Sequence, residues 1–149
     1  MNTQTPQNTQ ETVELRLRTM RTLWIAMILS IVGYFIFSFF EGPSKDVKPN
    51  PTLSLVLLGV SVSAALISFL LKSKLLNRAF ELQQVQLVQQ GYIVALAMCE
   101  VGGLLGLLDF FVTGDRYYYV LFIIAAVGQL LHFPQREHVV KALGKTPIY

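Results

Sequence analysis

Charged residues are scarce in this chain. Asp, Glu, Lys and Arg make up 14% of its 149 residues, whereas about 25% is typical of soluble domains. Hydrophobic residues make up 53%. This balance excludes an ordinary soluble domain and predicts a membrane protein. The net charge of +3 is modest, so we expect no nucleic-acid partner.

Residues that commonly bind metals or cofactors are also scarce. Cys99 is the only cysteine, so an intramolecular disulfide is excluded. The two histidines, His132 and His138, are separated by Pro134, and no second span offers an axial haem ligand. The sequence contains no C-x-x-C, H-x-x-x-H or G-x-S-x-G motif and no phosphate-binding loop. We therefore expect no cofactor, no metal and no enzymatic activity.

Long apolar stretches fill most of the chain. A hydrocarbon core of about 30 Å needs roughly 20 helical residues to cross it, with a range of about 17–25. Because a backbone in lipid must satisfy its own hydrogen bonds, each such stretch is predicted to be a helix. The sequence therefore predicts an all-α polytopic membrane protein with four transmembrane helices, at 23–40, 53–71, 93–112 and 117–131.

The segments outside these spans are more polar. Residues 1–12 are rich in Asn, Thr and Gln and are predicted to be a disordered tail. Residues 13–133 then form one four-helix transmembrane domain. Within it, 75–90 has apolar residues at helical spacing opposite several glutamines. We expect an amphipathic cytoplasmic helix that runs on into the third span with a bend at Gly91. Residues 134–149 are predicted to be a cytoplasmic tail with one short surface helix.

Basic residues favour one side of the membrane. Nine of the twelve Lys and Arg residues lie in the N-terminal segment, the loop between the second and third spans, and the C-terminal tail. The other two loops hold only Lys45, Lys48 and Arg116. The positive-inside rule then predicts that both termini face the cytoplasm.

The third span carries a stripe of small residues. At about 100° per residue, five of its residues share one face: Ala95, Cys99, Gly102, Gly106 and Asp109. Gly102 and Gly106 form a G-x-x-x-G pair, which allows another helix backbone to approach closely in lipid. Gly128 belongs to a similar stripe on the last span. We predict that Ala95 and Cys99, together with these three glycines, are helix-packing positions.

Glu100 is an acidic residue near the middle of the third span and points away from that stripe. A charged carboxylate at mid-bilayer costs at least about 2.5–3.5 kcal/mol, so Glu100 should face another helix or a neighbouring subunit. It either bridges helices through a serine hydroxyl or binds a proton or cation. The serines available to it are Ser30, Ser61, Ser63 and Ser68.

Other polar side chains are also predicted to form hydrogen bonds between helices. They are Ser61, Ser63, Asp109, Gln129 and His132. Asp109 lies near the outer end of its span, where we expect it to reach lipid headgroups or Arg116.

Two resemblances involve this part of the chain. Glu100-Val101-Gly102-Gly103-Leu104-Leu105, followed by Leu107-Leu108 and Phe110-Phe111, resembles the ion-binding helix of rotary ATPase c subunits. That resemblance implies an ion-binding carboxylate at Glu100. The partner helix in that family is glycine-rich, whereas the first two spans here contain only Gly33 and Gly59.

The second resemblance covers the C-terminal hairpin. The run from Glu100 through Gly106 to Leu131-His132-Phe133-Pro134-Gln135-Arg136-Glu137 is similar to small, uncharacterised four-span bacterial membrane proteins. It implies a location in the bacterial cytoplasmic (inner) membrane and carries over no active site.

The sequence thus predicts a non-enzymatic membrane protein that acts through helix–helix association. It would be an accessory or structural subunit of a membrane complex, or a homo-oligomer, with the lipid bilayer and other membrane subunits as its partners. The alternative is proton or cation translocation through Glu100. A membrane enzyme for a lipophilic substrate is a third class, but it would need a polar and charged cluster between helices that the sequence does not predict.

Overall fold

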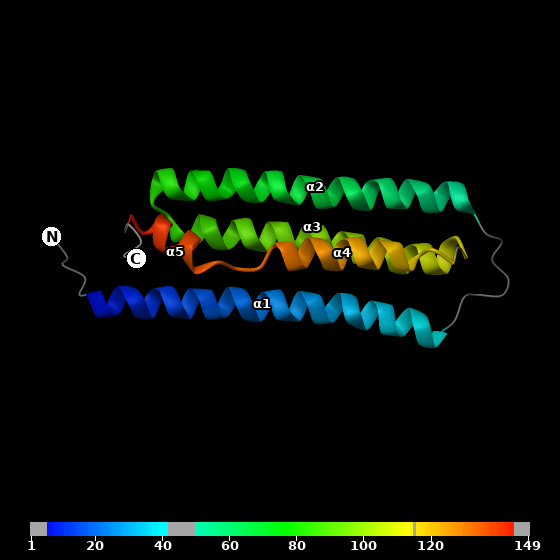
Figure 1. Cartoon of the computed structure of the whole chain (residues 1–149), viewed down its shortest axis with the longest axis horizontal. Helices are drawn as coiled ribbons and strands as arrows, with labels where there is room; N and C mark the ends of the chain where they lie inside the picture. Colours follow the sequence, from blue (N-terminus) through cyan, green and yellow to red (C-terminus); the bar gives the residue numbers. More distant parts are fainter. Residues whose placement is uncertain (1–5, 42–49, 115, 145–149) are drawn as a thin grey trace.

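The computed structural model describes residues 6–41, 50–114 and 116–144 of the chain. These residues form an all-α bundle (Figure 1), which confirms the all-α part of the predicted fold class. The helices are α1 (Pro6–Glu41), α2 (Pro51–Leu82), α3 (Val85–Val112), α4 (Tyr119–Leu131) and α5 (Arg136–Ala142).

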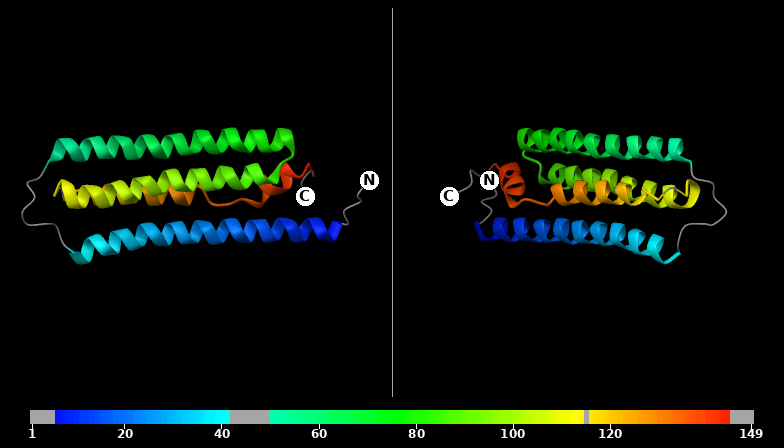
Figure 2. Two further views of the ribbon diagram at one scale, coloured as in Figure 1. Left: turned by 180° about the vertical axis from the view of Figure 1, so that it is seen from behind. Right: turned by 45° about the vertical axis from the view of Figure 1, so that its right-hand side comes forward.

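Helix α3 is the centre of this bundle. α1 and α2 lie on opposite sides of α3, and no described residues of α1 and α2 are in contact. α4 packs against α1, α2 and α3, and α5 packs beyond it against the same three helices. Figure 2 shows from two further sides that α4 and α5 follow one another along α3. α3 therefore contacts every other helix.

Each of the three long helices runs antiparallel to the one before it. The two ends of the bundle therefore contain different parts of the chain. We call one the α5 end: it contains the start of α1, the junction of α2 with α3, and α5. We call the other the Thr113 end: it contains the end of α1, the start of α2, and the junction of α3 with α4.

Three of the helices are long and apolar enough to cross a membrane. α1, α2 and α3 contain 36, 32 and 28 residues, which corresponds to about 54, 48 and 42 Å at 1.5 Å per residue. α4 contains 13 residues, or about 20 Å, and is too short to cross a 30 Å core alone. The predicted fourth span is therefore a helix, but a fourth crossing stays a prediction.

Most exposed large side chains of these helices are apolar. Examples on the outward faces are Leu29 and Phe40 of α1, Leu55 and Leu66 of α2, and Leu130 of α4, each between 55% and 82% exposed. Faces of this kind suggest that lipid surrounds the bundle. Together with the three long apolar helices, they suggest a membrane protein.

The N-terminal segment is more ordered than predicted. α1 begins at Pro6, so the prediction of a disordered tail is wrong for residues 6–12, while residues 1–5 lie outside the described part. Proline suits the first helical turn because its missing N–H would have no helical partner there. Val13 and Leu17, which are 4% and 2% exposed, pack on the other helices and hold this part of α1 in place.

The polar segment between the second and third spans contains a chain reversal. α2 continues to Leu82, and Gln83 adopts a left-handed conformation with φ 49° and ψ 44°. α3 then begins at Val85, so the prediction of one helix running into the third span is wrong. Gly91 is not a bend: a Cβ there would lie 3.3 Å from Leu75 Cβ, so it marks a close approach of α3 to α2.

The α5 end has an apolar core of its own. Its buried residues come from four helices: Val13, Leu17, Met20, Leu76, Ala79, Val85, Val88, Tyr92, Val139 and Ala142. The short helix predicted in the C-terminal tail is present as α5. It is docked rather than free, because two of its side chains are fully buried in this core.

Candidate functional site

Glu100 links α3 to two other helices. Its Oε1 accepts a hydrogen bond from Ser30 Oγ of α1 at 2.6 Å. Its Oε2 accepts one from Gln129 Nε2 of α4 at 3.0 Å. The side chain is half-buried, and both oxygens have neutral donors. Glu100 therefore faces helices of its own chain, and Ser30 is the only one of the four candidate serines that bonds to it among the described residues.

Serines spaced seven residues apart form a seam between α2 and α3. Ser54, Ser61 and Ser68 are each at most 8% exposed, and they share one face of α2 because seven residues make about two helical turns. Ser54 Oγ donates to Asp109 at 2.9 Å. Ser61 Oγ would lie 2.8 Å from a Cβ at Gly102.

This serine seam is a signal that the sequence prediction missed. α2 and α3 are antiparallel, so a step of seven residues along one helix meets a step of seven along the other. The pairing of Ser54 with Asp109 and of Ser61 with Gly102 shows this register. The predicted Ser63 lies outside the seam and is exposed.

Asp109 is fully buried at the Thr113 end. It accepts hydrogen bonds from Ser54 Oγ at 2.9 Å and from Thr113 Oγ1 at 2.7 Å. The Thr113 carbonyl in turn accepts from Asn50 N–H at 3.0 Å. The prediction that Asp109 reaches headgroups or Arg116 is therefore wrong: a buried carboxylate needs donors close by, and α2 and α3 supply them.

His132 follows α4 and is fully buried against α2. Its Nε2 lies 2.8 Å from Ser68 Oγ. Because Ser68 donates its only hydroxyl proton to Ala65 O at 2.6 Å, His132 Nε2 must be the donor in this pair. His132 Nδ1 is then an acceptor, and it has no partner among the described residues.

The predicted helix-packing positions are used inside the chain. Ala95 and Cys99 are 0% and 1% exposed. A Cβ at Gly106 would lie 3.3 Å from Leu121 and Phe122 of α4, and one at Gly128 would lie 2.9 Å from Cys99 Sγ. The stripe on α3 therefore serves α2 and α4 and is not available to another protein.

α4 ends beside the middle of α3, and 132–135 continues without helical structure. Side chains of other helices satisfy backbone groups here. Trp24 Nε1 of α1 donates to the Gln129 carbonyl at 2.8 Å, and Gln135 N–H donates to Tyr92 OH at 3.1 Å. Backbone groups that are buried without helical hydrogen bonds require protein partners of this kind.

Tyr92 also holds α5 in place. Its hydroxyl lies 2.7 Å from His138 Nδ1, and Lys72 Nζ lies 4.2 Å from the centre of its ring. Burial lowers the pKa of His138, and the positive charge of Lys72 acts in the same direction. A lowered pKa favours the neutral imidazole, in which Nδ1 can accept a hydrogen bond from the tyrosine hydroxyl.

The described residues include no group of three or more His, Cys, Asp or Glu side chains that could hold a metal ion. The polar contacts present are instead carboxyl, hydroxyl, amide and imidazole hydrogen bonds between helices. They can connect helices or exchange protons.

Comparison with protein-family models, curated proteins and solved structures finds no match. The resemblances to rotary ATPase c subunits and to small four-span bacterial membrane proteins therefore stay predictions.

Proposed function

We propose that this chain is a non-enzymatic integral membrane protein that acts by associating with other membrane helices, as an accessory or structural subunit or as a homo-oligomer. One observation carries the proposal. At Gly33 of α1 and Gly59 of α2, no described atom beyond the local backbone of the same helix lies within 4 Å of the position that a Cβ would take. Glycine inside a helix costs about 1 kcal/mol relative to alanine, and no contact within the described chain requires it at these two positions.

Glycines in α3 and α4 support this reading. A Cβ at Gly91, Gly102, Gly103, Gly106 or Gly128 would lie within 3.3 Å of another side chain. Each of these five glycines therefore lies where another part of the chain approaches its helix too closely for a larger residue. The two open glycines indicate contacts with a helix from outside the chain.

The outward face of α2 has the composition that such a contact needs. Gly59 and the exposed Ser63 are four residues apart and form a small-x-x-x-small pair. Pairs of this kind allow close backbone approach, which is a main source of helix association in lipid.

Replacement of both small residues tests the association. Gly59→Leu with Ser63→Leu should remove the complex seen by native mass spectrometry from membranes, while the thermal stability of the chain in detergent stays unchanged. Val62→Leu, at an exposed position about 100° around the same helix from Ser63, is the matched control and should keep the complex. A wild-type chain that is monomeric in native membranes would overturn the proposal.

The same proposal places the α5 end in the cytoplasm, with both termini on that side, in a cell membrane of the bacterial inner type. Basic residues from three separate segments meet at this end of the bundle: Arg16, Arg18, Arg21, Lys72, Lys74, Arg78, Arg136 and Lys141. This gathering supports a positive-inside orientation.

Labelling of introduced cysteines in intact cells tests the orientation. An impermeant reagent should label a cysteine at position 48 and leave one at position 74 unlabelled. The reverse pattern would show that the orientation is inverted.

A second candidate function, proton or cation translocation through Glu100, is favoured by one buried atom. Gln129 Oε1 has no hydrogen-bond partner among the described residues, because the amide uses its nitrogen on Glu100. If Glu100 carried a proton, the amide could turn over so that its oxygen accepts that proton, and the amide nitrogen would then take the place that has no partner. The pair can therefore hold one additional proton, or a cation in its place.

Glu100→Gln separates this candidate from simple association. A glutamine keeps the shape and can still bond to Ser30, so the fold and the complex should persist. Loss of proton or cation flux into liposomes with an intact fold would support translocation. Absence of flux from the wild-type chain would exclude it.

A further inference from the structure

The two open glycines point outward from opposite flanks of the bundle. Ile31 of α1 and Ser61 of α2 both face α3, each beside a glycine of that helix. Gly33 follows Ile31 by two residues and Gly59 precedes Ser61 by two, which is a rotation of about 200° around each helix. Both glycines therefore point away from α3, and α1 and α2 lie on opposite sides of α3 (Figure 1).

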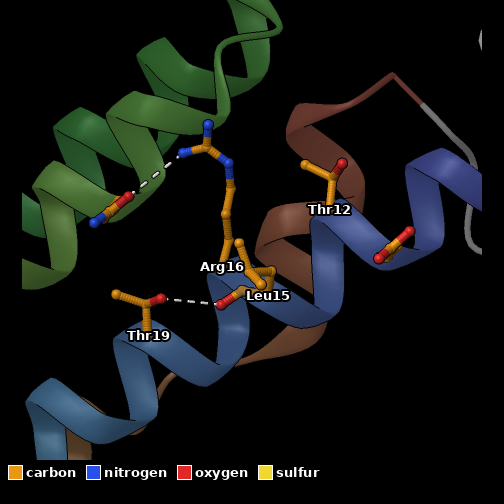
Figure 3. Close-up of a pocket in the computed structure, with 6 residues that line it drawn as sticks. Thr12, Leu15, Arg16 and Thr19 are labelled. Atoms are coloured by element: carbon orange, nitrogen blue, oxygen red, sulfur yellow. Dashed lines mark hydrogen bonds between the residues drawn. The ribbon is translucent and has the colours of Figure 1, made fainter.

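α1 keeps a nearly constant register along α3, to which it runs parallel. Near the α5 end, Arg16 extends from α1 toward α3 and donates to a residue 73 positions later in the chain (Figure 3). Further along, Ile31 meets Gly103, 72 positions later, where a Cβ would lie 3.1 Å from Ile31 Cγ1. Two more residues along both helices place Gly33 level with Leu105.

The serine seam gives a separate measure of depth, because α2 runs antiparallel to α3. Ser61 lies beside Gly102. Gly59 precedes Ser61 by two residues and is therefore level with Leu104. Its depth differs from that of Gly33 by one residue of α3, or about 1.5 Å. The two open glycines thus lie at nearly the same depth on opposite flanks of one chain.

The side chains next to these glycines are complementary in size. By the same register, Ala26 of α1 and Leu66 of α2 lie within one residue of the same depth, and so do Leu29 and Ser63. Each pair combines a small exposed residue with a leucine that is 63% or 62% exposed. The outer face of α2 therefore fits the outer face of α1, with each leucine opposite a small residue and glycine opposite glycine at the closest approach.

We propose that the partner in the association is a second copy of this chain, with α1 of one copy packed against α2 of the next and Gly33 facing Gly59. This rests on the proposed function and names the partner that it leaves open. Every copy inserts in the same positive-inside orientation, so the two helices run antiparallel and the glycines meet at equal depth. Because the two faces differ and lie on opposite flanks, the contact is head-to-tail and builds a ring or row of more than two copies.

Complementation of two defective variants tests the head-to-tail contact. Gly33→Leu blocks the α1 face and Gly59→Leu blocks the α2 face, so each variant expressed alone should be monomeric in native mass spectrometry from membranes. In co-expression, the first variant keeps its α2 face and the second keeps its α1 face. Dimers with one chain of each kind should then form and nothing larger, whereas the wild-type chain should form assemblies of more than two copies.

Disulfide cross-linking in native membranes tests the register. Ala26→Cys with Leu66→Cys in one chain should give a ladder of covalent dimers, trimers and larger species, because a disulfide needs Cα atoms within about 7 Å. The two positions cannot pair within one chain, since α3 lies between their helices. Ala26→Cys with Leu55→Cys is the matched control. Leu55 is 67% exposed on the same face of α2, but it lies about 16 Å from Leu66 along the helix, so this chain should stay uncross-linked. Cys99 is buried and is present in every variant.

The outcomes separate this proposal from the proposed function. Dimers of Gly33→Leu alone or of Gly59→Leu alone would overturn the head-to-tail contact, because each variant keeps only one of the two faces. Equal cross-linking in the Leu55 control would overturn the register. A native complex that holds this chain once, together with a different protein, would overturn the second copy and leave the proposed association standing. A monomeric wild-type chain would overturn both.

Discussion

The α5 end and the middle of the bundle pack the same three long helices with different side chains. The α5 end buries Leu17, Val88, Val139 and similar apolar residues, as a soluble protein does. Apart from the Tyr92 hydroxyl, the buried polar side chains among the described residues lie elsewhere: Ser38, Ser54, Ser61, Ser68, Asp109, Thr113, Gln129 and His132.

The difference is the one expected of the proposed placement, in which water surrounds the α5 end and lipid surrounds the rest of the bundle. Where water surrounds helices, burial of apolar surface drives them together. In lipid that driving force is absent, so close packing of small residues and hydrogen bonds between helices take its place. One continuous helix such as α3 therefore uses Val88 at one end and Gly102 and Asp109 further along.

The largest loss of stability should come from a substitution in the core of the α5 end. Leu17→Ala removes a side chain that is 2% exposed and should lower the free energy of unfolding by about 2–5 kcal/mol, through lost burial and a cavity. Thermal unfolding in detergent measures it. Leu15→Ala, at a 68% exposed position of the same helix, should change it little. Similar losses in the two variants would mean that no water-driven core exists at this end.

A large loss of stability is also expected in the middle of the bundle when a larger side chain replaces a glycine there. Gly106→Leu places a side chain against Leu121 and Phe122 and should cost about 3 kcal/mol or more by overpacking. Gly33→Leu makes the same change where no atom lies within 4 Å and should leave the monomer stable. A stable Gly106→Leu chain would show that α3 and α4 are not closely packed.

The serine seam offers a matched pair of smaller effects. Ser54→Ala leaves buried Asp109 without one of its donors and should cost about 1–3 kcal/mol. Ser61→Ala removes a hydroxyl that has no partner among the described residues and should be neutral or slightly stabilising. Chemical or thermal unfolding of the two variants side by side measures the difference. The opposite ranking would show that Ser61, not Ser54, carries the buried bond.

The smallest effect concerns pH at the α5 end. Burial and Lys72 lower the pKa of His138 below its ordinary 6.5. The stability that depends on neutral His138 is therefore fully present above about pH 6.5 and is lost as the pH falls below it. The rate of trypsin cleavage at Arg136 and Lys141, divided by the rate for the denatured chain at the same pH, should rise between pH 7 and pH 5 as α5 loosens. His138→Gln should flatten this part of the profile, and an unchanged slope would rule out His138 as the cause.

Prediction of the site was limited by contacts between distant segments. The spacing of Ala95, Cys99, Gly102 and Gly106 was enough to predict close helix packing, because small residues on one face have few other uses in lipid. The same spacing does not indicate which helix packs against this face. The partners of Glu100, Ser30 and Gln129, lie 70 and 29 residues away, and four serines were equally available before the helices were placed.

The sequence alone determined the all-α class and the helical character of the four apolar stretches, because hydropathy and backbone hydrogen bonding act locally. It did not determine the reversal at Gln83, since neither glycine nor proline marks the turn and a glutamine takes the left-handed conformation. It also did not determine that α4 ends beside the middle of α3. Only the tertiary structure decided these points, because Trp24, Tyr92 and Ser68 satisfy the polar groups of 129–135 from three other helices, and such satisfaction exists only once the helices are packed.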